Sequence, residues 1–434
     1  MKETNISKLI GTVREQISSF GLFTNVVMLV FLKYLMEKPE SIGVGSVDYK
    51  NIYQFRKLFD QAKDGKKVLQ AQDFELLLDS IDFVGKATTE SFFFHDLSTS
   101  YEKLFVREYS QAVLFNAIND FVLPDSLEEM KMFFETVLAA SAGDVRRTGE
   151  HITNKSLRTL VAKILDVQSN DLYLDCFCGY STMLLSLDNY YEYYGYDIDY
   201  SSFCVSVMME LMLGRKESHV VCGDFLEKDN VVLANKLFSD APLGLRFGPG
   251  AMPSLEYYDK SKDLNVIAIY KALDSLCDGG RAVFTVPARA LTSVSRGYTE
   301  LRKMLAESGL RAVIELPSLW AGTVVQTNLL VVEKGYTGKV EFIAAGNAGV
   351  KAKDKSQTVL TEEDIAKIME SYQKELNVEN YSINVDRRDV ICANTFAISK
   401  YMTPQSTIVD YRSVEDIDNE LDELYARLHD NLRK

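Results

Sequence analysis

The sequence predicts an α/β protein in which a doubly wound sheet follows an α-helical domain and precedes a C-terminal coiled-coil helix. Three observations predict this arrangement. Runs of β-branched residues are scarce before about residue 140. From about residue 145, short apolar runs alternate with amphipathic stretches, as in βαβ units. The last segment carries apolar residues at spacings of four and three, as in a coiled coil.

The N-terminal domain, expected over residues 1–142, has the pattern of packed helices. The apolar run over 26–35 is too short to span a bilayer, and 127–140 has apolar residues at spacings of three and four. The apolar pattern also includes residues 76–78, Ile81, Phe83 and Val84. These helices either pack only among themselves or also dock a partner or DNA. Periodicity alone leaves both alternatives open.

The central domain, expected over residues 143–350, has alternating strand and helix patterns. The expected strands cover residues 172–174, 193–196, 220–222, 281–286, 311–315 and 328–333. The expected helices cover residues 156–165, 201–213, 264–276 and 299–308. In a doubly wound sheet of this kind, ligands bind outside the carboxyl ends of the strands.

The C-terminal region, expected over residues 351–434, begins with a helix after Thr361 and ends in a helix capped by Ser413, with Asp416 three residues on. The seam of this last helix consists of Ile417, Leu421, Leu424, Leu428 and Leu432. Such a helix can pack back on its own domain, but its narrow apolar seam favours a partner helix.

Composition limits the class of protein. The 434 residues suggest two or three domains, and no apolar run reaches the ~20 residues of a membrane helix. With no signal-like N-terminus and no disulfide or zinc spacing among the six cysteines, a soluble cytoplasmic protein without a metal is expected. The net charge of −14 argues against a general nucleic-acid coat, but it leaves room for a local basic patch or a basic partner.

Four segments carry the candidate chemistry, and they follow one another along the central domain. They are GEHITN (149–154), LDCFCGYS (174–181), YGYDID (194–199) and CGDF (222–225). After the first strand, Gly179 lets the backbone approach a ligand closely. After the second, Asp197 can accept hydrogen bonds from both ribose hydroxyls. After the third, Asp224 can accept one from an adenine amine, so the set indicates a nucleoside-bearing cofactor.

The ordered set resembles the modification subunits of type I restriction–modification systems, which are gamma-type adenine-N6 DNA methyltransferases. Those proteins carry G-x-F-Y-T-P, then D-P-A-C-G-T-G, an acidic motif and G-D. The resemblance implies a Rossmann-like domain that binds S-adenosylmethionine. It assigns cofactor contacts to these residues of the four segments: Thr153, Asp175, Cys178, Gly179, Asp197, Ile198, Asp224 and Phe225.

The resemblance extends over nearly the whole chain. It includes residues 31–35 (FLKYL), 278–282 (DGGRA) and 313–317 (VIELP), followed by 322–323 and 326–328. The C-terminal seam resembles the helix with which these subunits grip a specificity subunit. The resemblance therefore implies DNA, a specificity subunit and a restriction subunit as partners, with the C-terminal helix in a coiled coil.

The catalytic motif of the family, N-P-P-F or N-P-P-Y, is matched here by Asp240-Ala241-Pro242-Leu243. In the family, the first side chain and a backbone carbonyl accept the two hydrogens of the adenine amine, and the last aromatic ring stacks on the flipped base. Asp240 and the Ala241 carbonyl can accept those hydrogens, and Pro242 fixes the loop. Leu243 cannot stack as an aromatic ring does, and Phe247 is the only candidate to replace it in the following loop.

Other positions also depart from the family pattern. Tyr180 and Ser181 replace Thr-Gly, which predicts added bulk beside the cofactor, and Ala241 predicts a less rigid carbonyl than proline would give. In the first segment, His151 and Ile152 replace two aromatic residues and Asn154 replaces proline. His151 is interpreted as an ordinary polar residue at a helix entry.

Three functions remain open from the sequence. The first is an active adenine-N6 methyltransferase subunit that works with a specificity partner. The second is a non-catalytic scaffold or DNA-binding subunit with the same fold, which the departures favour. The third is a methyltransferase acting on RNA or protein, against which the long flanking resemblance counts.

Overall fold

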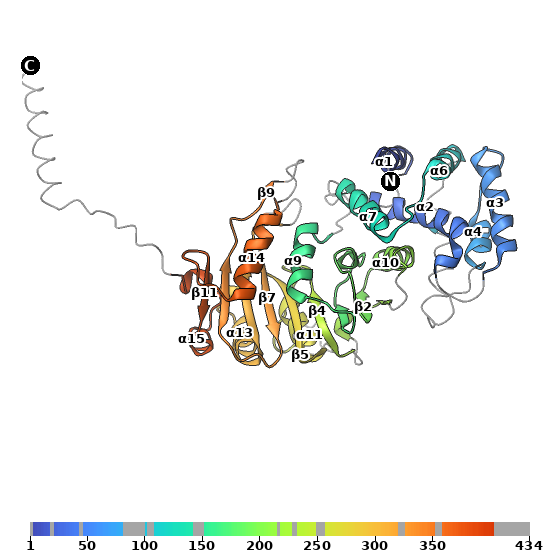
Figure 1. Ribbon diagram of the computed structural model, residues 1–434. Helices are drawn as coiled ribbons and strands as arrows, with labels where there is room; N and C mark the ends of the chain where they lie inside the picture. The colour runs from blue at the N-terminus through green and yellow to red at the C-terminus, as the bar shows by residue number, and fades with distance from the viewer. Residues whose placement is uncertain are drawn as a thin grey trace, which may run out of the picture.

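The computed structural model describes residues 3–17, 21–42, 47–80, 100–101, 108–141, 152–214, 218–227, 232–248, 257–319, 326–351 and 358–402. In Figure 1 the N-terminal helices gather at one end, and the sheet with its covering helices forms the rest of the described molecule.

A nine-stranded sheet is the centre of the fold, and its strand order is β11-β8-β6-β7-β5-β4-β1-β2-β3. Most of its strands are parallel, and only β7 and β11 run against their neighbours. The bounds are β1 Leu172–Asp175, β2 Glu192–Asp197, β3 Ser218–Cys222, β4 Ala234–Ser239, β5 Leu276–Pro287, β6 Leu310–Glu315, β7 Thr327–Glu333, β8 Val340–Ala344 and β11 Ser382–Val385. A separate pair consists of β9 Val350–Lys351 and β10 Thr358–Val359.

The six strands predicted from the sequence are confirmed as β1, β2, β3, β5, β6 and β7. The chain reverses its direction of winding between β1 and β4, which lie side by side and parallel. In doubly wound sheets this reversal opens a crevice at the carboxyl ends of the two strands.

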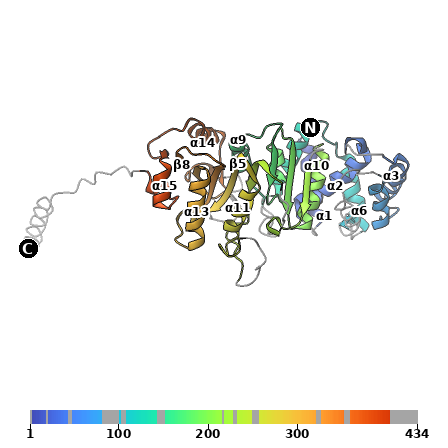
Figure 2. The same ribbon diagram turned by 90° about the horizontal axis from the view of Figure 1, so that it is seen from below.

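Helices cover both faces of the sheet (Figures 1 and 2). One face carries α9 Lys155–Leu165, α10 Tyr200–Met212 and α14 Glu362–Lys374. The other face carries α11 Leu264–Asp274, α12 Ala288–Thr292, α13 Arg296–Ser308 and α15 Arg387–Ala393. The apolar stripes of these helices bury the two faces, which is why the strands read as nearly continuous apolar runs. Short 3-10 turns complete this part: η2 Thr182–Leu185, η3 Phe225–Glu227 and η4 Ile398–Lys400.

The elements of the N-terminal part are helices in the described residues, as the sequence predicts. Its elements are α1 Glu3–Gln16, α2 Leu22–Glu37, η1 Pro39–Ile42, α3 Tyr49–Lys63, α4 Ala71–Leu78, α6 Glu108–Asp120 and α7 Leu127–Ser141. Nearly every side chain of α2 is buried, because the helix is apolar on all sides and lies at the centre of the group. Its Lys33 is buried too, and its Nζ donates to the Ile118 and Asn119 carbonyls at 2.9 and 3.0 Å. That contact ties α2 to the end of α6, where a cation is favoured.

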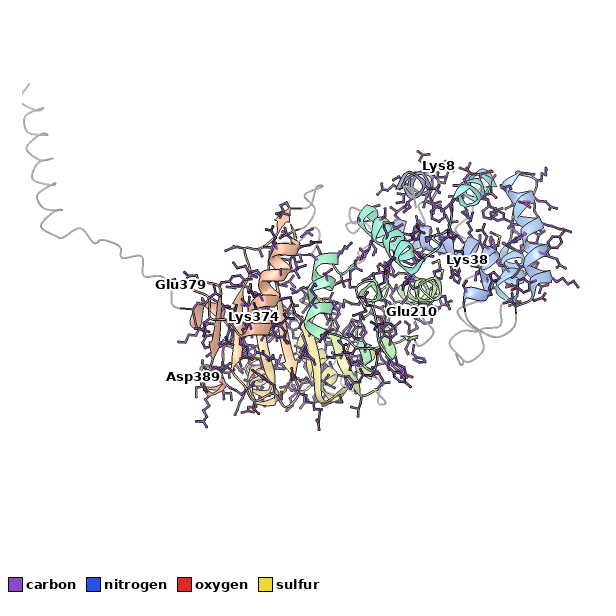
Figure 3. All side chains as sticks on the ribbon, in the orientation of Figure 1. Lys8, Lys38, Glu210, Lys374, Glu379 and Asp389 are labelled. Carbon is purple, nitrogen blue, oxygen red and sulfur yellow. The ribbon has the colours of Figure 1, made fainter. Side chains whose placement is uncertain are left out.

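The N-terminal helices share one hydrophobic core with a face of the sheet. Contacts join α2 to α10, and the same cluster of buried residues continues from α1 to α14. Figure 3 shows Glu210 on α10 between the sheet and the N-terminal helices, with Lys8 and Lys38 beyond it. The helical part is therefore packed against the sheet rather than tethered to it.

The residues that follow β7 extend the same sheet. Thr361 caps α14 by accepting from the Asp364 N–H at 3.1 Å, and Asp364 reciprocates at 2.8 Å, which confirms the helix expected after Thr361. Strand β11 then pairs with β8 at the edge of the sheet. The predicted seam from Ile417 to Leu432 lies outside the described residues. No helix within the described part of the chain is long and apolar enough to cross a membrane.

Candidate functional site

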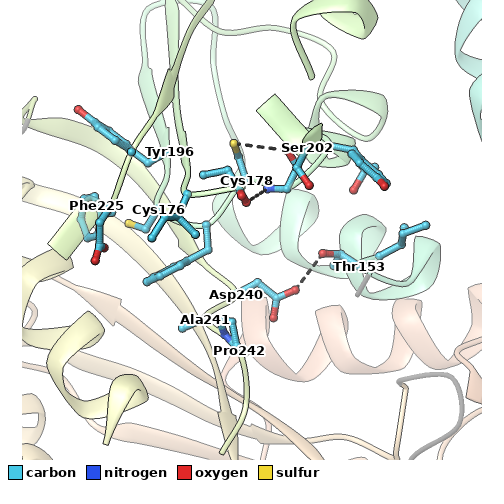
Figure 4. Close-up of a pocket in the computed structure, with 18 of the residues that line it drawn as sticks. Thr153, Cys176, Cys178, Tyr196, Ser202, Phe225, Asp240, Ala241 and Pro242 are labelled. Carbon is cyan, nitrogen blue, oxygen red and sulfur yellow. Dashed lines mark hydrogen bonds between the residues drawn. The ribbon is translucent and has the colours of Figure 1, made fainter. Parts of the chain in front are cut away.

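A cavity of about 350 Å³ opens at the carboxyl ends of the central strands. Its walls come from the turns that follow β1, β2, β3 and β4, and from the segment just before α9. Figure 4 shows Asp240 and Thr153 on one side, with Tyr196 and Phe225 across from them. All the predicted site residues line this cavity except Asp175.

Gly179 and Asp197 form the best-defined corner of the cavity. The Gly179 N–H donates to Asp197 Oδ2 at 2.9 Å, and the Asp199 N–H donates to Asp197 Oδ1 at 2.8 Å. Gly179 has a φ of +53°, which favours glycine, and no protein atom lies within 4 Å of the point where a Cβ would stand. Burial raises the pKa of Asp197 above its ordinary value, while the two backbone N–H groups oppose that rise.

The expected bulk of Tyr180 and Ser181 is divided between two places, because Tyr180 lines the cavity and Ser181 does not. The Tyr180 ring packs against Phe23 of α2 with centroids 5.2 Å apart, and its hydroxyl lies 3.3 Å from Thr24 Oγ1. Ser181 has a φ of +53° and a buried hydroxyl, which lies 2.8 Å from the Tyr193 hydroxyl. The Ser181 hydroxyl therefore supports the turn from behind the cavity, while the Tyr180 ring is anchored on α2 and Tyr180 still lines the cavity.

The turn after β3 forms the far wall. Asp224 Oδ1 accepts from the Leu226 N–H at 2.9 Å, so the carboxylate is fixed at the cavity edge. The Phe225 ring packs on Tyr196 at 5.5 Å and meets Phe177 edge-on at 6.0 Å. Ile198 stands at the rim with 73% of its surface exposed. This wall offers apolar surface and one acceptor, which suits a flat heterocycle.

Asp175 lies behind the turn rather than on the cavity wall. It is buried, and its Oδ1 accepts from the Phe177 N–H at 3.4 Å. Burial, and then the charge of Asp240, raise its pKa well above the ordinary value. Its geometry therefore fits support of the turn better than direct contact with a ligand.

Asp240 directly follows β4, and both of its carboxylate oxygens accept hydrogen bonds from threonines. Thr153 Oγ1 donates to Oδ2 at 2.9 Å, and the Thr285 hydroxyl donates to Oδ1. Burial raises the Asp240 pKa to about 6, although both hydroxyls act to lower it. Thr153, expected to contact the cofactor, thus also contacts the catalytic candidate.

The Ala241 carbonyl is held by a neighbouring side chain, which gives it support that does not depend on the proline ring of the family pattern. Asn265 Nδ2 donates to it at 3.3 Å, and Asn265 Oδ1 accepts from the Gly244 N–H at 3.4 Å. Asn265 is buried in the first turn of α11. One amide therefore fixes both ends of the turn that contains Pro242.

Phe247 does not replace the missing aromatic ring in this structure. Its ring packs on Tyr258 with centroids 6.4 Å apart, and it is not among the described residues that line the cavity. The position beside Pro242 on the cavity wall is taken by Leu243.

The first predicted segment enters α9. Asn154 is the N-cap, accepting from the Ser156 N–H at 2.9 Å, and its Nδ2 donates to the Leu319 and Thr358 carbonyls. Asparagine thus does the capping that its type favours, in the place where the family pattern has proline. Ile152 lines the cavity, and His151 lies outside the described residues.

Sequence reasoning missed Thr285 and Asn265. Neither belongs to a motif, and each reaches the site only because a neighbouring element lies beside β4. Thr285 is one residue beyond Phe284, which pairs with Ser239 in the parallel β4–β5 register. A prediction of β4 from the sequence would have led to Thr285, because the pairing of β4 with β5 brings Thr285 beside Asp240.

The fold and the site together define the class of protein to which this chain is similar. A sheet with β7 antiparallel between β5 and β6, and a cavity after β1 to β4, is similar in fold to solved methyltransferase subunits. A crystal structure of a type I restriction–modification methyltransferase subunit from Streptococcus thermophilus matches with a TM-score of 0.72, at 16% identity, over 91% of this chain and 97% of that chain. A modification subunit of a putative type I restriction enzyme from Vibrio vulnificus matches with a TM-score of 0.63, at 13% identity, over 90% of this chain and 93% of that chain.

The sequence comparison narrows the class to a family. The model of the N-6 DNA methylase family matches residues 126–408, and the chain belongs to that family. The methylase subunit of the type I restriction enzyme MpnII from Mycoplasma pneumoniae is 22% identical over 342 residues. That match covers 70% of this chain, and it spans 62% of the length of the relative. The predicted resemblance to modification subunits is thereby confirmed.

Proposed function

We propose that this chain is the modification subunit of a type I restriction–modification system and methylates N6 of a flipped DNA adenine with S-adenosylmethionine. The observation that carries the proposal is the meeting of two halves of one site. The hydrogen-bond acceptors Asp240 and Ala241 share a cavity with the Gly179–Asp197 corner. A methyl donor bound at that corner would face an amine held by the acceptors.

The cavity suits S-adenosylmethionine in size and lining. Its volume of about 350 Å³ lies within the range of small-ligand sites, which is roughly 300–1,000 Å³. Asp197 has lone pairs left for ribose hydroxyls, because each of its oxygens accepts one backbone hydrogen bond. Asp224 and Phe225 would then contact the adenine ring, while Thr153, Cys178 and Ile198 would line the rest.

The acceptors address the weak nucleophilicity of the adenine amine. Its lone pair is delocalised into the ring, and hydrogen bonds from the amine to Asp240 and to the Ala241 carbonyl favour a more nucleophilic geometry. The transfer breaks the bond between the sulfur and the methyl carbon of S-adenosylmethionine and forms a bond from that carbon to N6. The surplus proton of the amine leaves to solvent.

Leu243 limits how the flipped base is held. Stacking of a base on an aromatic ring is worth ~1–3 kcal/mol, and a leucine supplies contact without a π face. We therefore expect the target base to bind more weakly than in a relative with an aromatic residue at this position, so that the partner contributes more of the binding.

The partner assignment follows the names of the similar proteins, which are subunits of type I systems. We propose that a specificity subunit supplies the DNA sequence recognition and that the seam from Ile417 to Leu432 pairs with it in a coiled coil. A restriction subunit would complete the system.

A methyl-transfer assay tests the proposal. The chain is co-purified with a type I specificity subunit, and tritium transfer from labelled S-adenosylmethionine to DNA is measured. We expect adenine-N6 labelling that Asp240→Ala lowers by at least ~100-fold, because both the side-chain acceptor and its charge are removed. Cofactor binding without any labelling would contradict the enzyme and favour a scaffold of the same fold.

A further inference from the structure

The parallel pairing of β4 and β5 brings a threonine against Asp240. Ser239 and Phe284 are partners in the register, and the residues that follow them, Asp240 just after β4 and Thr285 in β5, are in contact. Thr285 is buried, and its Oγ1 contacts Asp240 Oδ1. On the other side, Thr153 Oγ1 contacts Oδ2 at 2.9 Å.

The direction of both bonds follows from chemistry. An ionised carboxylate only accepts hydrogen bonds, so each threonine hydroxyl must donate its single hydrogen to Asp240. The Ser239 carbonyl lies 3.5 Å from Thr285 Oγ1, at the limit of a hydrogen bond, and cannot share that hydrogen equally.

These two hydroxyls are the groups that offset the charge of Asp240. The described residues that line the cavity include no lysine, arginine or histidine. The other carboxylates that line the cavity are Asp197, at the end of β2, and Asp224, in the turn after β3, while Asp175 lies behind the wall close enough for its pKa to be raised by the charge of Asp240. Because the charged side chains among the described residues that line the cavity are all carboxylates, an ionised Asp240 depends on neutral donors.

We propose that Thr285 is a positioning residue for methyl transfer, whose hydroxyl holds the Asp240 carboxylate ionised and turned so that a free lone pair faces the adenine amine. This inference rests on the proposed function. Thr285 itself lies outside the cavity lining and would not touch the substrate. It acts through Asp240, whose pKa of about 6 is already lowered by the hydroxyl against the effect of burial.

The central variant is Thr285→Val, which keeps the shape and removes the hydroxyl. We expect kcat at pH 7 to fall roughly tenfold or more, since a hydrogen bond to a charged group is lost, with an unchanged KM for S-adenosylmethionine. The acidic limb of the pH–rate profile should move to higher pH, because the carboxylate now ionises less readily. Thr285→Ser should restore both values.

The controls separate positioning from packing. Thr299→Val removes a threonine hydroxyl that bonds the Ser295 carbonyl on α13, away from the cavity, and should leave kcat and the profile unchanged. If Thr285→Val folds poorly, Thr285→Ala replaces it, and the same pH–rate measurement is made on that variant. A lower kcat with an unshifted acidic limb of the pH–rate profile, in Thr285→Val or in the Thr285→Ala variant that replaces it, would overturn the proposal.

A second readout does not need activity. The Asp240 carboxyl is titrated by NMR in the full chain labelled with ¹³C-aspartate, and Asp240→Asn identifies its signal. We expect a higher pKa in Thr285→Val than in the natural protein, with Thr285→Ser close to the natural value. Equal pKa values in all three would overturn the proposal. If the natural chain transfers no methyl group, the proposed function fails. This titration still decides whether Thr285 keeps the Asp240 carboxylate ionised.

Discussion

Single residues in this site show how a carboxylate can stand where the family pattern has asparagine. An asparagine would present one acceptor and one donor to its neighbours, whereas Asp240 accepts from Thr153 and Thr285 at once. The two threonines therefore match an aspartate better than an asparagine. The departure at position 240 is accompanied by donors that suit it, which argues against simple decay of the motif.

The ionisation of Asp240 predicts a pH dependence. Burial raises its pKa from 3.8 to about 6, and only the ionised form has both oxygens free of hydrogen to accept the amine. The rate of methyl transfer should therefore rise with pH through about 6 and level off above it. The measurement is kcat from pH 5 to 8.

Asp240→Asn is the matched variant for that profile. It keeps an acceptor oxygen but cannot titrate, so the acidic limb should disappear even if the rate is lower. Persistence of the same limb in Asp240→Asn would assign it to another group, and Asp240 would lose its predicted role.

The sequence predicts a single site residue where that residue belongs to an ordered motif. Asp197 and Asp224 were expected at the ends of strands and Asp240 in the catalytic motif, and all three line one cavity. Thr285 and Asn265 were out of reach, because their roles depend on which element lies beside β4. The packing of the Tyr180 ring on Phe23 was also out of reach, since the direction of a side chain out of a turn cannot be read from its size.

At the scale of elements, the turn from Asp240 to Gly244 is braced by the first turn of α11. Asn265→Ala would leave the buried Ala241 carbonyl and the Gly244 N–H without this partner. We expect a loss of ~1–3 kcal/mol in the free energy of unfolding and a lower kcat. Urea denaturation measures the first quantity.

Asn265→Asp refines that test. It keeps the acceptor for Gly244 but loses the donor to Ala241, so kcat should fall as in Asn265→Ala. If both variants turned over at the natural rate, the brace would have no part in catalysis.

Strand β8 carries a buried carboxyl group with a measurable consequence. Glu341 is fully buried, and neither of its oxygens has a hydrogen-bond partner among the described residues. Burial raises its pKa from 4.5 to about 8, although Arg311 acts in the opposite direction. The folded protein thus holds this proton more tightly than the unfolded chain, and stability falls as the pH rises from 4.5 to about 8.

Glu341→Gln should remove that loss. We expect its Tm to exceed the natural one at pH 8.5 and the difference to shrink at pH 5, while Glu363→Gln on the exposed surface of α14 changes little. A difference in Tm that is the same at both pH values would show that Glu341 does not titrate in this way.

Elements with long, unbroken apolar runs were predictable, and β4 and β8 were not. The strand β4, ANKLFS, has only Leu237 and Phe238 as large apolar residues, and Asn235 and Lys236 break its pattern. Its place in the sheet comes from pairing with β1 and β5 on both sides. Tertiary contacts, rather than local propensity, make this segment a strand.

At the scale of the whole molecule, the Tyr180 ring connects the turn after β1 to the N-terminal helices. The ring packs on Phe23 of α2 and is almost fully buried. Tyr180→Ala should therefore cost ~3–5 kcal/mol in the free energy of unfolding. The exposed Tyr191 is the matched control, and Tyr191→Ala should cost less than ~0.5 kcal/mol. A similar small loss in both variants would mean that the helices and the sheet are not coupled through Tyr180.

The broad division of the chain was visible in the sequence, because the change from helical to alternating patterns marks where the sheet begins. What the pattern could not give is the packing of α2 against α10, since an apolar helix can be buried against any apolar surface. The extension of the sheet by β11 was not predictable either, because its sequence, SINV, carries no strong strand signal of its own.

The most direct test of the account is calorimetric titration of the purified chain with S-adenosylmethionine. We predict binding that Asp197→Ala abolishes and that Asp278→Ala, a change at an aspartate with a 99% exposed side chain, leaves intact. That result would place the methyl donor beside Asp240. No binding to the folded natural chain, alone or with the specificity subunit, would contradict the account and leave a methyltransferase fold without its chemistry.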